Sequence, residues 1–373
     1  MQMADCGLRG PKRTLMNPHL LISVSAHGFG HIGQTAPVLQ ALRARLPRLK
    51  VTVRSAAPSF KIRERFGADI EHQSIQLDIG MIQRNALEVR VEESARAYRA
   101  FHTSWAERVA AEAEVLSALR PDLVLANVPY LSLAAATRCR VPAVALCSLS
   151  WADIYRHYCE GRRREAGQVL DEMLSSYNSA LCFLQPEPSM PMRGIANGRP
   201  IGPIAQLGTA RREELLGKIG AAPHERLIMI SLGGMDARLP IENWRDLSGL
   251  RLIVPAAWQA GHPCATAFED LGMPFADAMA SCDALIGKPG YGSFVEAACL
   301  GLPVLYLERP DWPEAPYLVR WLERQGRCAP LRSPQIETGS IRPMLETLWS
   351  LPSPTVAPRG VDEAAAYLAG LLA

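Results

Sequence analysis

The sequence lacks the cysteine patterns that mark zinc or redox sites. Its 373 residues include nine cysteines, but no two of them form a CxxC pair and none stands near a histidine at zinc-finger spacing. We therefore expect free thiols, most of them buried, and no metal centre. A strong excess of charge is lacking as well. The formal net charge is +3, which argues against a general nucleic-acid-binding protein.

Long apolar runs are also absent. No stretch of 18 apolar residues occurs, and the N-terminus does not combine a basic region, an apolar run and a cleavage site. The composition, with 48% hydrophobic and 21% charged residues, is that of a soluble globular protein, which we expect to be cytoplasmic. Residues 1–18 carry polar, Gly and Pro residues, and we expect them to form a loose extension before the first strand.

What the chain does contain is a repeated strand-and-helix pattern. Short runs rich in β-branched and other apolar residues occur at 19–25, 50–55, 122–128, 141–149 and 180–184, and segments with helical periodicity lie between them. The same alternation restarts at 226–234, 250–256, 283–288 and 302–308. Together with the length of the chain, this pattern predicts an α/β fold of two tandem doubly wound, Rossmann-like parallel sheets. Ligands of such sheets bind beyond the carboxyl ends of the strands, so we expect both domains to face a shared cleft.

A proline-rich stretch without periodicity separates the two halves. We place a linker at 186–208, between an N-terminal domain at 19–185 and a C-terminal domain at 209–360. The last residues, 361–373, are expected to form a helix that packs back on the N-terminal domain. Within the first domain, the amphipathic segment 91–119 predicts one long helix across a sheet face.

The first glycine-rich loop follows the first predicted strand, in the sequence SAHGFGHIGQTAPVLQAL at 25–42. Gly28, Gly30 and Gly33 have the GxGxxG spacing of dinucleotide-binding folds, in which the third glycine packs the helix on the strand. An NAD site also needs an acid at the end of the second strand, where this chain has Arg54. The NAD interpretation is therefore disfavoured.

His31 distinguishes this loop from a plain glycine turn, because it stands at the mouth of the helix directly after Gly30. A neutral imidazole is a suitable general base near pH 7. The alternative is a histidine that caps the helix or bonds within the loop, and we favour the functional role. For His27, in the same loop, the functional and structural interpretations are equally compatible with the sequence.

A second candidate site lies in the strand-turn-helix-strand pattern ALIGKPGYGSFVEAACLGLPVLYLE at 284–308. Small or turn-forming residues stand where the strand passes to the helix: Pro289, Gly290, Gly292 and Ser293. Such a turn exposes backbone N–H groups and the positive end of the helix to an anion. Glu296, one turn further on, can accept hydrogen bonds from ribose hydroxyls. The alternative is that Ser293 and Glu296 form a helix capping box.

Two further loops carry weaker signals. Gly233 and Gly234 follow a predicted strand and would let the backbone approach a phosphate, although a simple strand-ending turn explains them equally well. Asp311 and Glu314, after another strand, can meet sugar hydroxyls, and solvated surface acids are the alternative.

The motifs HGFGHIGQTAPVL and GKPGYGSFVEAACLGLPVLYLERPDWPEAPYL together resemble those of GT-B glycosyltransferases, with the MurG-like enzymes as the nearest type. They are also similar to the glycosyltransferase-like N-terminal region of plant L-arabinokinases. The resemblance covers nearly the whole chain. It implies transfer of a hexosyl group from a nucleotide-diphosphate sugar, with UDP favoured, to the hydroxyl of a small-molecule or lipid-linked acceptor. No cofactor is implied, and the absence of a DxD motif is consistent with an inverting, metal-independent reaction.

The same resemblance implies a role for each matching residue. His31 would deprotonate the acceptor, Glu296 would hold the ribose, and the backbone near Phe275 would read the nucleobase. The donor diphosphate would be approached by Gly30 and cradled by Gly233, Gly234, Gly290, Tyr291, Gly292 and Ser293. The donor sugar would meet Asp311 and Glu314.

This chain departs from the family pattern in two places. Related enzymes often have Asp-Gln or Gln-Gln where it has Asp311 to Glu314, and some have an acid where it has Asn127, so His31 would act without a carboxylate orienter. On the acceptor side, the aromatic and basic stretch 151–167 is compatible with an anionic or lipid-linked acceptor and peripheral contact with the inner membrane face, or with a solvated helix end. Two other functions fit the motifs: a nucleotide-sugar hydrolase or 2-epimerase, and an inactive nucleotide-sugar-binding module.

Overall fold

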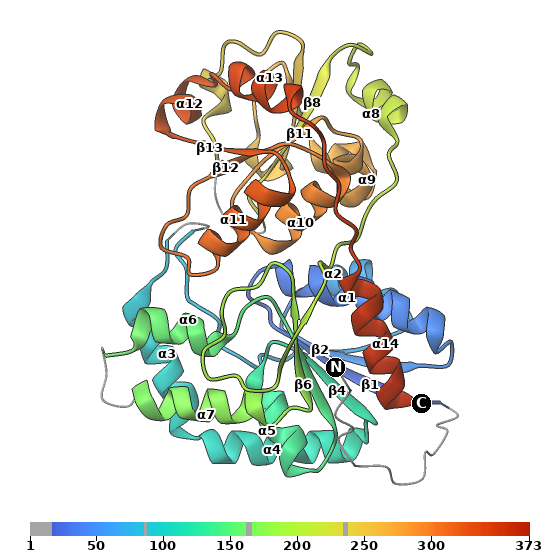
Figure 1. The fold of residues 1–373 in the computed structure, drawn as a ribbon, viewed down its shortest axis with the longest axis vertical. Coiled ribbons are helices and arrows are strands. Elements are labelled where there is room, and N and C mark those ends of the chain that lie inside the picture. The colour runs from blue at the N-terminus through green and yellow to red at the C-terminus, as the bar shows by residue number, and fades with distance from the viewer. Residues whose placement is uncertain (1–16, 86–87, 162–165, 234–237) are drawn as a thin grey trace, which may run out of the picture.

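The computed structural model describes residues 17–85, 88–161, 166–233 and 238–373. These residues form two α/β domains stacked along the long axis of the molecule, with the N-terminal domain at the bottom of Figure 1. Every strand pairing within the two sheets is parallel. The predicted fold class, two doubly wound Rossmann-like sheets, is thereby confirmed.

The N-terminal sheet has seven strands in the described part of the chain, in the order β3-β2-β1-β4-β5-β6-β7. Their bounds are β1 His19–Val24, β2 Lys50–Arg54, β3 Glu71–Gln73, β4 Leu123–Asn127, β5 Ala143–Leu146, β6 Cys182–Pro186 and β7 Gly198–Ile201. Because β2 and β4 flank β1, the topological switch point of this sheet lies at β1 and β4. β7 falls within the range 186–208 that the sequence analysis gave to the linker, so the sheet extends further along the chain than expected.

Helices cover both faces of this sheet (Figure 1). One face packs against α1 Gly30–Arg45, α2 Ser59–Phe66 and the returning C-terminal helix α14 Gly360–Leu372. The other packs against α3 Val91–Thr103, α4 Trp105–Leu119, α5 Tyr130–Arg138, α6 Trp151–Cys159 and α7 Ala166–Asn178. Successive strand residues point to opposite faces: Leu20 and Ile22 belong to the first core and Leu21 to the second.

The expected single helix at 91–119 is two helices. α3 ends at Thr103 and α4 begins at Trp105, with Ser104 between them in a non-helical conformation. Residues on both sides of the break are buried in one core, which is why the apolar pattern continues through it. The amphipathic period therefore indicated helical structure over this segment and was wrong about the continuity of the helix.

The C-terminal sheet repeats the arrangement with six strands in the described residues, in the order β10-β9-β8-β11-β12-β13. The strands are β8 Arg226–Ser231, β9 Leu250–Val254, β10 Ala265–Ala267, β11 Ala284–Gly287, β12 Val304–Leu307 and β13 Cys328–Leu331. The helices are α8 Arg212–Ile219, α9 Phe275–Ala280, α10 Tyr291–Leu300, α11 Ala315–Gln325, α12 Ser333–Thr338 and α13 Arg342–Ser350, with short 3-10 segments at Ile241–Asn243, Ala256–Trp258 and Phe268–Leu271.

The chain crosses between the domains through residues 202–211 and is fixed to the C-terminal domain where it arrives. The N–H of Thr209 donates to Asp277 Oδ1 over 2.9 Å. A Cβ at Gly208 would lie 2.1 Å from the backbone carbon of Ala276, so only glycine allows this close approach. The crossing segment is therefore packed closely on the start of α9.

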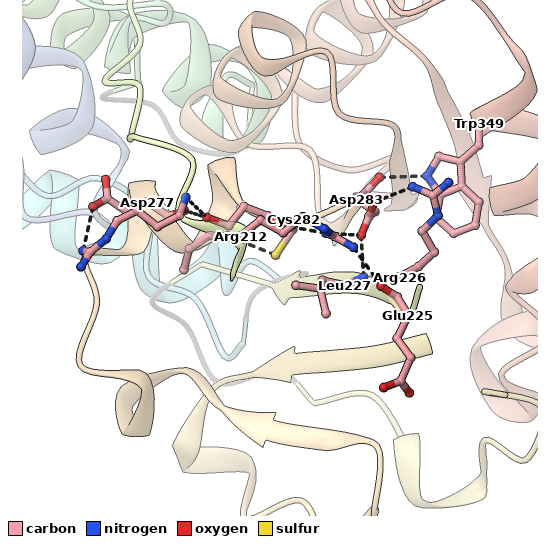
Figure 2. Close-up of polar contacts among 11 residues, drawn as sticks. Arg212, Glu225, Arg226, Leu227, Asp277, Cys282, Asp283 and Trp349 are labelled. Carbon is pink, nitrogen blue, oxygen red and sulfur yellow. Dashed lines mark hydrogen bonds and ion pairs between the residues drawn. The ribbon is translucent and has the colours of Figure 1, made fainter. Parts of the chain in front are cut away.

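Asp283 completes this attachment at the amino ends of β8 and β11 (Figure 2). Its carboxylate accepts hydrogen bonds from Arg212 Nη1 at 2.7 Å, Arg226 Nη1 at 2.7 Å and the N–H of Leu227 at 2.8 Å. Its carbonyl oxygen accepts from Trp349 Nε1 at 2.9 Å. A single acid thus joins α8, β8 and α13 at the amino end of β11.

At the domain interface, α1 contacts α10, so the helices that follow β1 and β11 meet there. These are the helices that begin at the two glycine-rich loops. Among the described residues, no helix has both the length and the apolarity needed to cross a membrane.

Candidate active site

His31 is the second residue of α1, and its side chain is only 6% exposed. Its Nδ1 lies 2.9 Å from Asn127 Oδ1 and 3.6 Å from Cys147 Sγ. Asn127 ends β4 and Cys147 follows β5, so the carboxyl ends of two neighbouring strands hold the imidazole. Burial lowers the pKa of His31 to about 4, against a smaller opposing effect of Asn127, and the ring is therefore neutral at pH 7.

His27 is held by contacts that give it a structural role. Its ring stacks on Trp312 of the C-terminal domain, with centroids 5.9 Å apart, and meets Trp151 edge-on at 5.0 Å. Its Nε2 lies 3.0 Å from the carbonyl oxygen of Met81 and donates to it. A Cβ at Gly80 would lie 2.7 Å from the imidazole, so glycine is required there. Burial lowers the pKa of His27 to about 3.

Asp78 positions the indole that lies beside both histidines. It accepts hydrogen bonds from Trp151 Nε1 at 2.7 Å and from Ser25 Oγ at 3.1 Å. Burial raises its pKa to about 6, because these two hydrogen bonds only partly offset the desolvation of the charged form. The Trp151 ring centroid lies 5.6 Å from that of His31.

Glu314 of the C-terminal domain is buried in a hydrogen-bond network of the N-terminal domain. Ser148 Oγ donates to Glu314 Oε1 over 2.6 Å, and Trp312 Nε1 donates to Oε2 over 3.3 Å. Gln34 Nε2 donates to Ser148 Oγ over 2.8 Å, and Asn127 Nδ2 donates to Gln34 Oε1 over 3.2 Å. Burial raises the pKa of Glu314. Both oxygens of a carboxylate expected to meet the donor sugar are thus engaged by protein groups.

Across the interface, α10 begins at Tyr291 and has Gly290 as its N-cap, with no side-chain capping bond. Ser293 is therefore inside the helix, and the capping box considered from the sequence does not form. Glu296 instead accepts a hydrogen bond from the backbone N–H of Gln206 in the crossing segment. Burial raises the pKa of Glu296 to about 7, and the positive charge of Arg65 in α2 opposes this shift.

Packing does not explain several of the loop glycines. A Cβ at Gly30 or Gly292 would meet no atom within 4 Å, and at Gly33 nothing closer than Arg65 at 3.9 Å. The close packing of helix on strand expected from the third glycine of a dinucleotide fingerprint is therefore absent. Backbone N–H groups at the first turn of α10 have no partner within the helix, and Gly290 and Gly292 leave room there, so this end of the helix can approach a ligand.

The remaining predicted residues are placed as follows. Gly233, with φ of +78°, lies in the loop after β8, while Gly234 lies outside the described residues. The Tyr291 hydroxyl accepts from the N–H of Ile204 at 2.9 Å and so contacts the crossing segment. Phe275 starts α9 and packs edge-on against Phe268, with centroids 5.4 Å apart. The side chain of Asp311 is exposed, whereas its carbonyl oxygen accepts from the Tyr158 hydroxyl across the interface.

Two cationic residues at this site were missed by the sequence analysis. Lys288 follows β11 and Arg309 lies just beyond β12, so both stand at carboxyl ends of neighbouring strands. Arg309 is only 7% exposed, and its Nε and Nη2 have no hydrogen-bond partner among the described residues. Burial, together with the charge of Arg309, lowers the pKa of Lys288 to about 8. Their position directly after predicted strands was the signal that could have found them.

Arg309 lies close to the aromatic side chains of the candidate site. Its guanidinium carbon lies 4.3 Å from the ring centroid of Trp312, which stacks on His27. The positive charges of Arg309 and Lys288 both act on His27 and lower its pKa. Within the described residues, no cluster of His, Cys, Asp or Glu is arranged to hold a metal ion. The candidate site thus combines the neutral imidazole of His31, the buried guanidinium of Arg309, the partly buried ammonium of Lys288 and the N-terminus of α10.

The stretch considered for acceptor or membrane contact is partly buried. Trp151, Tyr155 and Tyr158 of α6 are 0%, 3% and 8% exposed and face the core of the N-terminal domain. The basic residues at 162–164 lie outside the described residues. An open cavity of about 690 Å³ lies elsewhere on the interface, between the β6–β7 region, α11 and α14, and none of the predicted site residues lines it.

Comparison with known proteins supports the architecture. No family model matches the sequence. L-arabinokinase from Arabidopsis thaliana is 23% identical over 320 residues, which are 82% of this chain. The chain spans about 30% of the length of that relative.

Solved structures match along almost the whole chain. The glycosyltransferase of kitacinnamycin is 15% identical with a TM-score of 0.61, and 96% of this chain and 95% of that one are covered. Glycosyltransferase VinC, solved in complex with dTDP, is 16% identical with a TM-score of 0.56, and 95% of each chain is covered. A candidate UDP-N-acetylglucosamine 2-epimerase from Listeria monocytogenes is 14% identical with a TM-score of 0.54, covering 94% and 96%. The chain shares the fold of these proteins, the GT-B arrangement of two Rossmann-like domains.

Proposed function

We propose that this protein is a glycosyltransferase that moves a sugar from a nucleotide-diphosphate sugar to an acceptor hydroxyl. The observation that carries the proposal is the state of His31. Its Nδ1 is engaged by Asn127 at 2.9 Å, and no described residue bonds to its Nε2. The ring is neutral at pH 7 because burial lowers its pKa to about 4. Nε2 is therefore available to accept a proton at the interface between the two domains.

The reaction follows from this geometry. His31 Nε2 takes the proton of the acceptor hydroxyl while the acceptor oxygen forms a bond to the anomeric carbon. The bond from that carbon to the phosphate oxygen breaks, and the nucleoside diphosphate leaves with the electron pair. A single displacement of this kind inverts the anomeric configuration and requires only one base.

The leaving diphosphate would be stabilised by the C-terminal domain. The first N–H groups of α10, at Gly290 to Ser293, offer hydrogen bonds and the positive end of the helix. Arg309 adds a buried guanidinium with unpartnered N–H groups, and Lys288 adds a second cation on the adjacent strand end. Two cations beside a helix N-terminus can neutralise charge on a leaving phosphate without a metal ion.

The nucleoside would lie along α9 and α10. Glu296 would accept hydrogen bonds from the ribose, and the backbone near Phe275 would meet the base, with UDP as the first donor to test and a hexosyl group as its sugar. The likeness to VinC, which was solved with dTDP, favours a nucleoside diphosphate in general. Because His31 is 6% exposed, the domain contact must open before an acceptor can reach it.

A second candidate function is a nucleotide-sugar hydrolase or 2-epimerase. The likeness to the Listeria monocytogenes protein favours it, and a neutral histidine can activate water as readily as an alcohol. A binding module without activity would share the fold and the nucleotide affinity and would lack turnover.

One set of incubations separates these functions. Nucleotide binding is measured first as a thermal shift with UDP, GDP and dTDP, and we expect at least one of them to raise Tm. Nucleotide sugars of the matching base are then incubated with and without a pool of acceptor alcohols. Release of nucleoside diphosphate that requires an acceptor supports the transferase, whereas equal release without acceptor indicates hydrolysis. A product with inverted C2 configuration indicates epimerisation, and the absence of any thermal shift would contradict the donor site.

A further inference from the structure

The hydrogen bonds at the domain interface form one unbroken chain from Glu314 to His31. Ser148 links Glu314 to Gln34, and Asn127 links Gln34 to His31 Nδ1. All five side chains are at least nine-tenths buried, so water does not compete with these bonds. The five residues come from four separate elements, α1, β4, the segment after β5 and the loop before α11.

The chain has a fixed polarity when Glu314 is ionised, the form that the nearby charge of Arg309 favours, because an ionised carboxylate can only accept hydrogen bonds. The Ser148 hydroxyl must donate to Glu314 over 2.6 Å, which leaves its oxygen to accept from Gln34 Nε2. Gln34 Oε1 then accepts from Asn127 Nδ2, and Asn127 Oδ1 faces the histidine. An oxygen at this position requires a proton on His31 Nδ1. The lone pair of the imidazole is therefore on Nε2.

No other neighbour fixes the tautomer of His31 in this way. The Cys147 sulfur, 3.6 Å from Nδ1, belongs to a thiol whose pKa burial raises well above its usual range, and a neutral thiol can either donate or accept. Reversing the amides of Asn127 and Gln34 would make the Ser148 hydroxyl donate to Gln34. The Ser148 oxygen would then face Glu314 Oε1 without a proton between them, which is repulsive.

We propose that Glu314 is a positioning residue for His31: when the domains close, its carboxylate docks on Ser148 and, through Gln34 and Asn127, fixes the histidine as the tautomer whose Nε2 can act as a base. The proposal rests on the base role of His31 argued above. It gives Glu314 a role different from the sugar contact expected from the sequence. It also supplies, from the opposite domain and through neutral side chains, the carboxylate orienter that Asn127 lacks.

The tautomer can be measured without any turnover. In protein labelled with ¹⁵N-histidine, His31 should show a protonated Nδ1 and an unprotonated Nε2, and His31→Ala assigns its signals. Ser148→Ala and Glu314→Gln should each convert this signature into a mixture of tautomers. Glu308→Gln, which removes an exposed carboxylate at the end of β12, is the matched control and should leave it unchanged. An unchanged His31 signature in both Ser148→Ala and Glu314→Gln would overturn the proposal.

Kinetics provide an independent test. Each of the two substitutions should lower kcat by roughly 10- to 100-fold with little change in the KM of the donor, because orientation of the base is lost and donor binding is not. The double variant should be no slower than the slower single variant, since both act through one chain. A rise in donor KM for Glu314→Gln with no effect of Ser148→Ala would show a direct sugar contact and overturn the positioning role. The positioning role and the proposed function fail in different experiments. Full turnover in His31→Ala would reject His31 as the base, whereas the tautomer of His31 is measured in protein that keeps the histidine and does not depend on turnover.

Discussion

His31 Nδ1 lies 2.9 Å from Asn127 Oδ1, so a carboxamide holds the ring at the end of β4. An amide oxygen orients the imidazole without adding a negative charge beside it. Burial therefore dominates, and the pKa of His31 falls to about 4. The protein keeps a neutral base over the whole physiological pH range, at the cost of the extra basicity that a neighbouring carboxylate would supply.

The first prediction concerns the pH dependence of turnover. Asn127→Asp places a carboxylate beside His31 and should raise the pKa of the histidine, because the negative charge favours the imidazolium. Below the raised pKa the base is protonated, so the acid limb of kcat/KM should move to higher pH than in the wild type. Asn243→Asp, at an exposed position, is the control. An acid limb that does not move in Asn127→Asp would show that His31 is not the group that titrates.

The second prediction concerns Arg309. Its buried guanidinium has unpartnered Nε and Nη2, so Arg309→Met should raise the Tm of the free protein. The same change should weaken binding of the nucleoside diphosphate by about 10- to 100-fold, the size expected for lost hydrogen bonds to a charged ligand. Arg332→Met removes an exposed arginine paired with Glu308 and is the matched control. Unchanged nucleotide affinity in Arg309→Met would remove Arg309 from the donor site.

The third prediction concerns Glu296 in the free protein. Because burial raises its pKa to about 7, its contribution to stability is complete below the pKa of the unfolded chain, near 4.5, and is lost as the pH rises through about 7. Glu296→Gln should therefore match the wild type in unfolding free energy at pH 4 and exceed it at pH 8. Urea titrations at both pH values measure the difference, with the exposed Glu323→Gln as control. A Glu296→Gln protein less stable than the wild type at pH 8 would contradict the prediction.

The fourth prediction concerns the attachment of the crossing segment. Asp283 accepts from two arginines and a backbone N–H, so Asp283→Ala should destabilise the protein by about 2–4 kcal/mol. Asp246→Ala, whose side chain is 75% exposed, should change stability by less than about 0.5 kcal/mol. Chemical denaturation compares the two, and equal small effects would show that the bonds in Figure 2 contribute little.

The fold could be predicted from the sequence wherever burial dictates composition. Central strands such as β1 and β8 are buried on both faces and read as β-branched runs. The edge strand β3, with the sequence EHQ, and β7, with GRPI, carry no such signal, because an edge needs few apolar residues. The interruption of the helix at Ser104 could not be predicted from the apolar pattern, because α3 and α4 pack into the same core and the pattern continues from one to the other.

The candidate site was only partly visible in the sequence. His31 and the α10 turn were singled out because glycine-rich loops after strands have a local signature, and their roles stay predictions. Arg309 and Lys288 were missed, since a lone basic residue in sequence resembles a solvated one. The chain from Glu314 to His31 could not have been predicted, because its members lie 166, 114, 93 and 96 residues apart along its successive links and are joined only by the packing of two domains.

The central claim is that His31 is the base of a sugar transfer, and His31→Ala tests it most directly. Turnover of the nucleotide sugar identified by thermal shift is compared with that of the wild type and of His157→Ala, which removes an exposed histidine of α6. We predict that kcat of His31→Ala falls by about 10²- to 10⁴-fold while nucleotide affinity is unchanged. Turnover equal to that of the wild type, with the nucleotide still bound, would contradict the account.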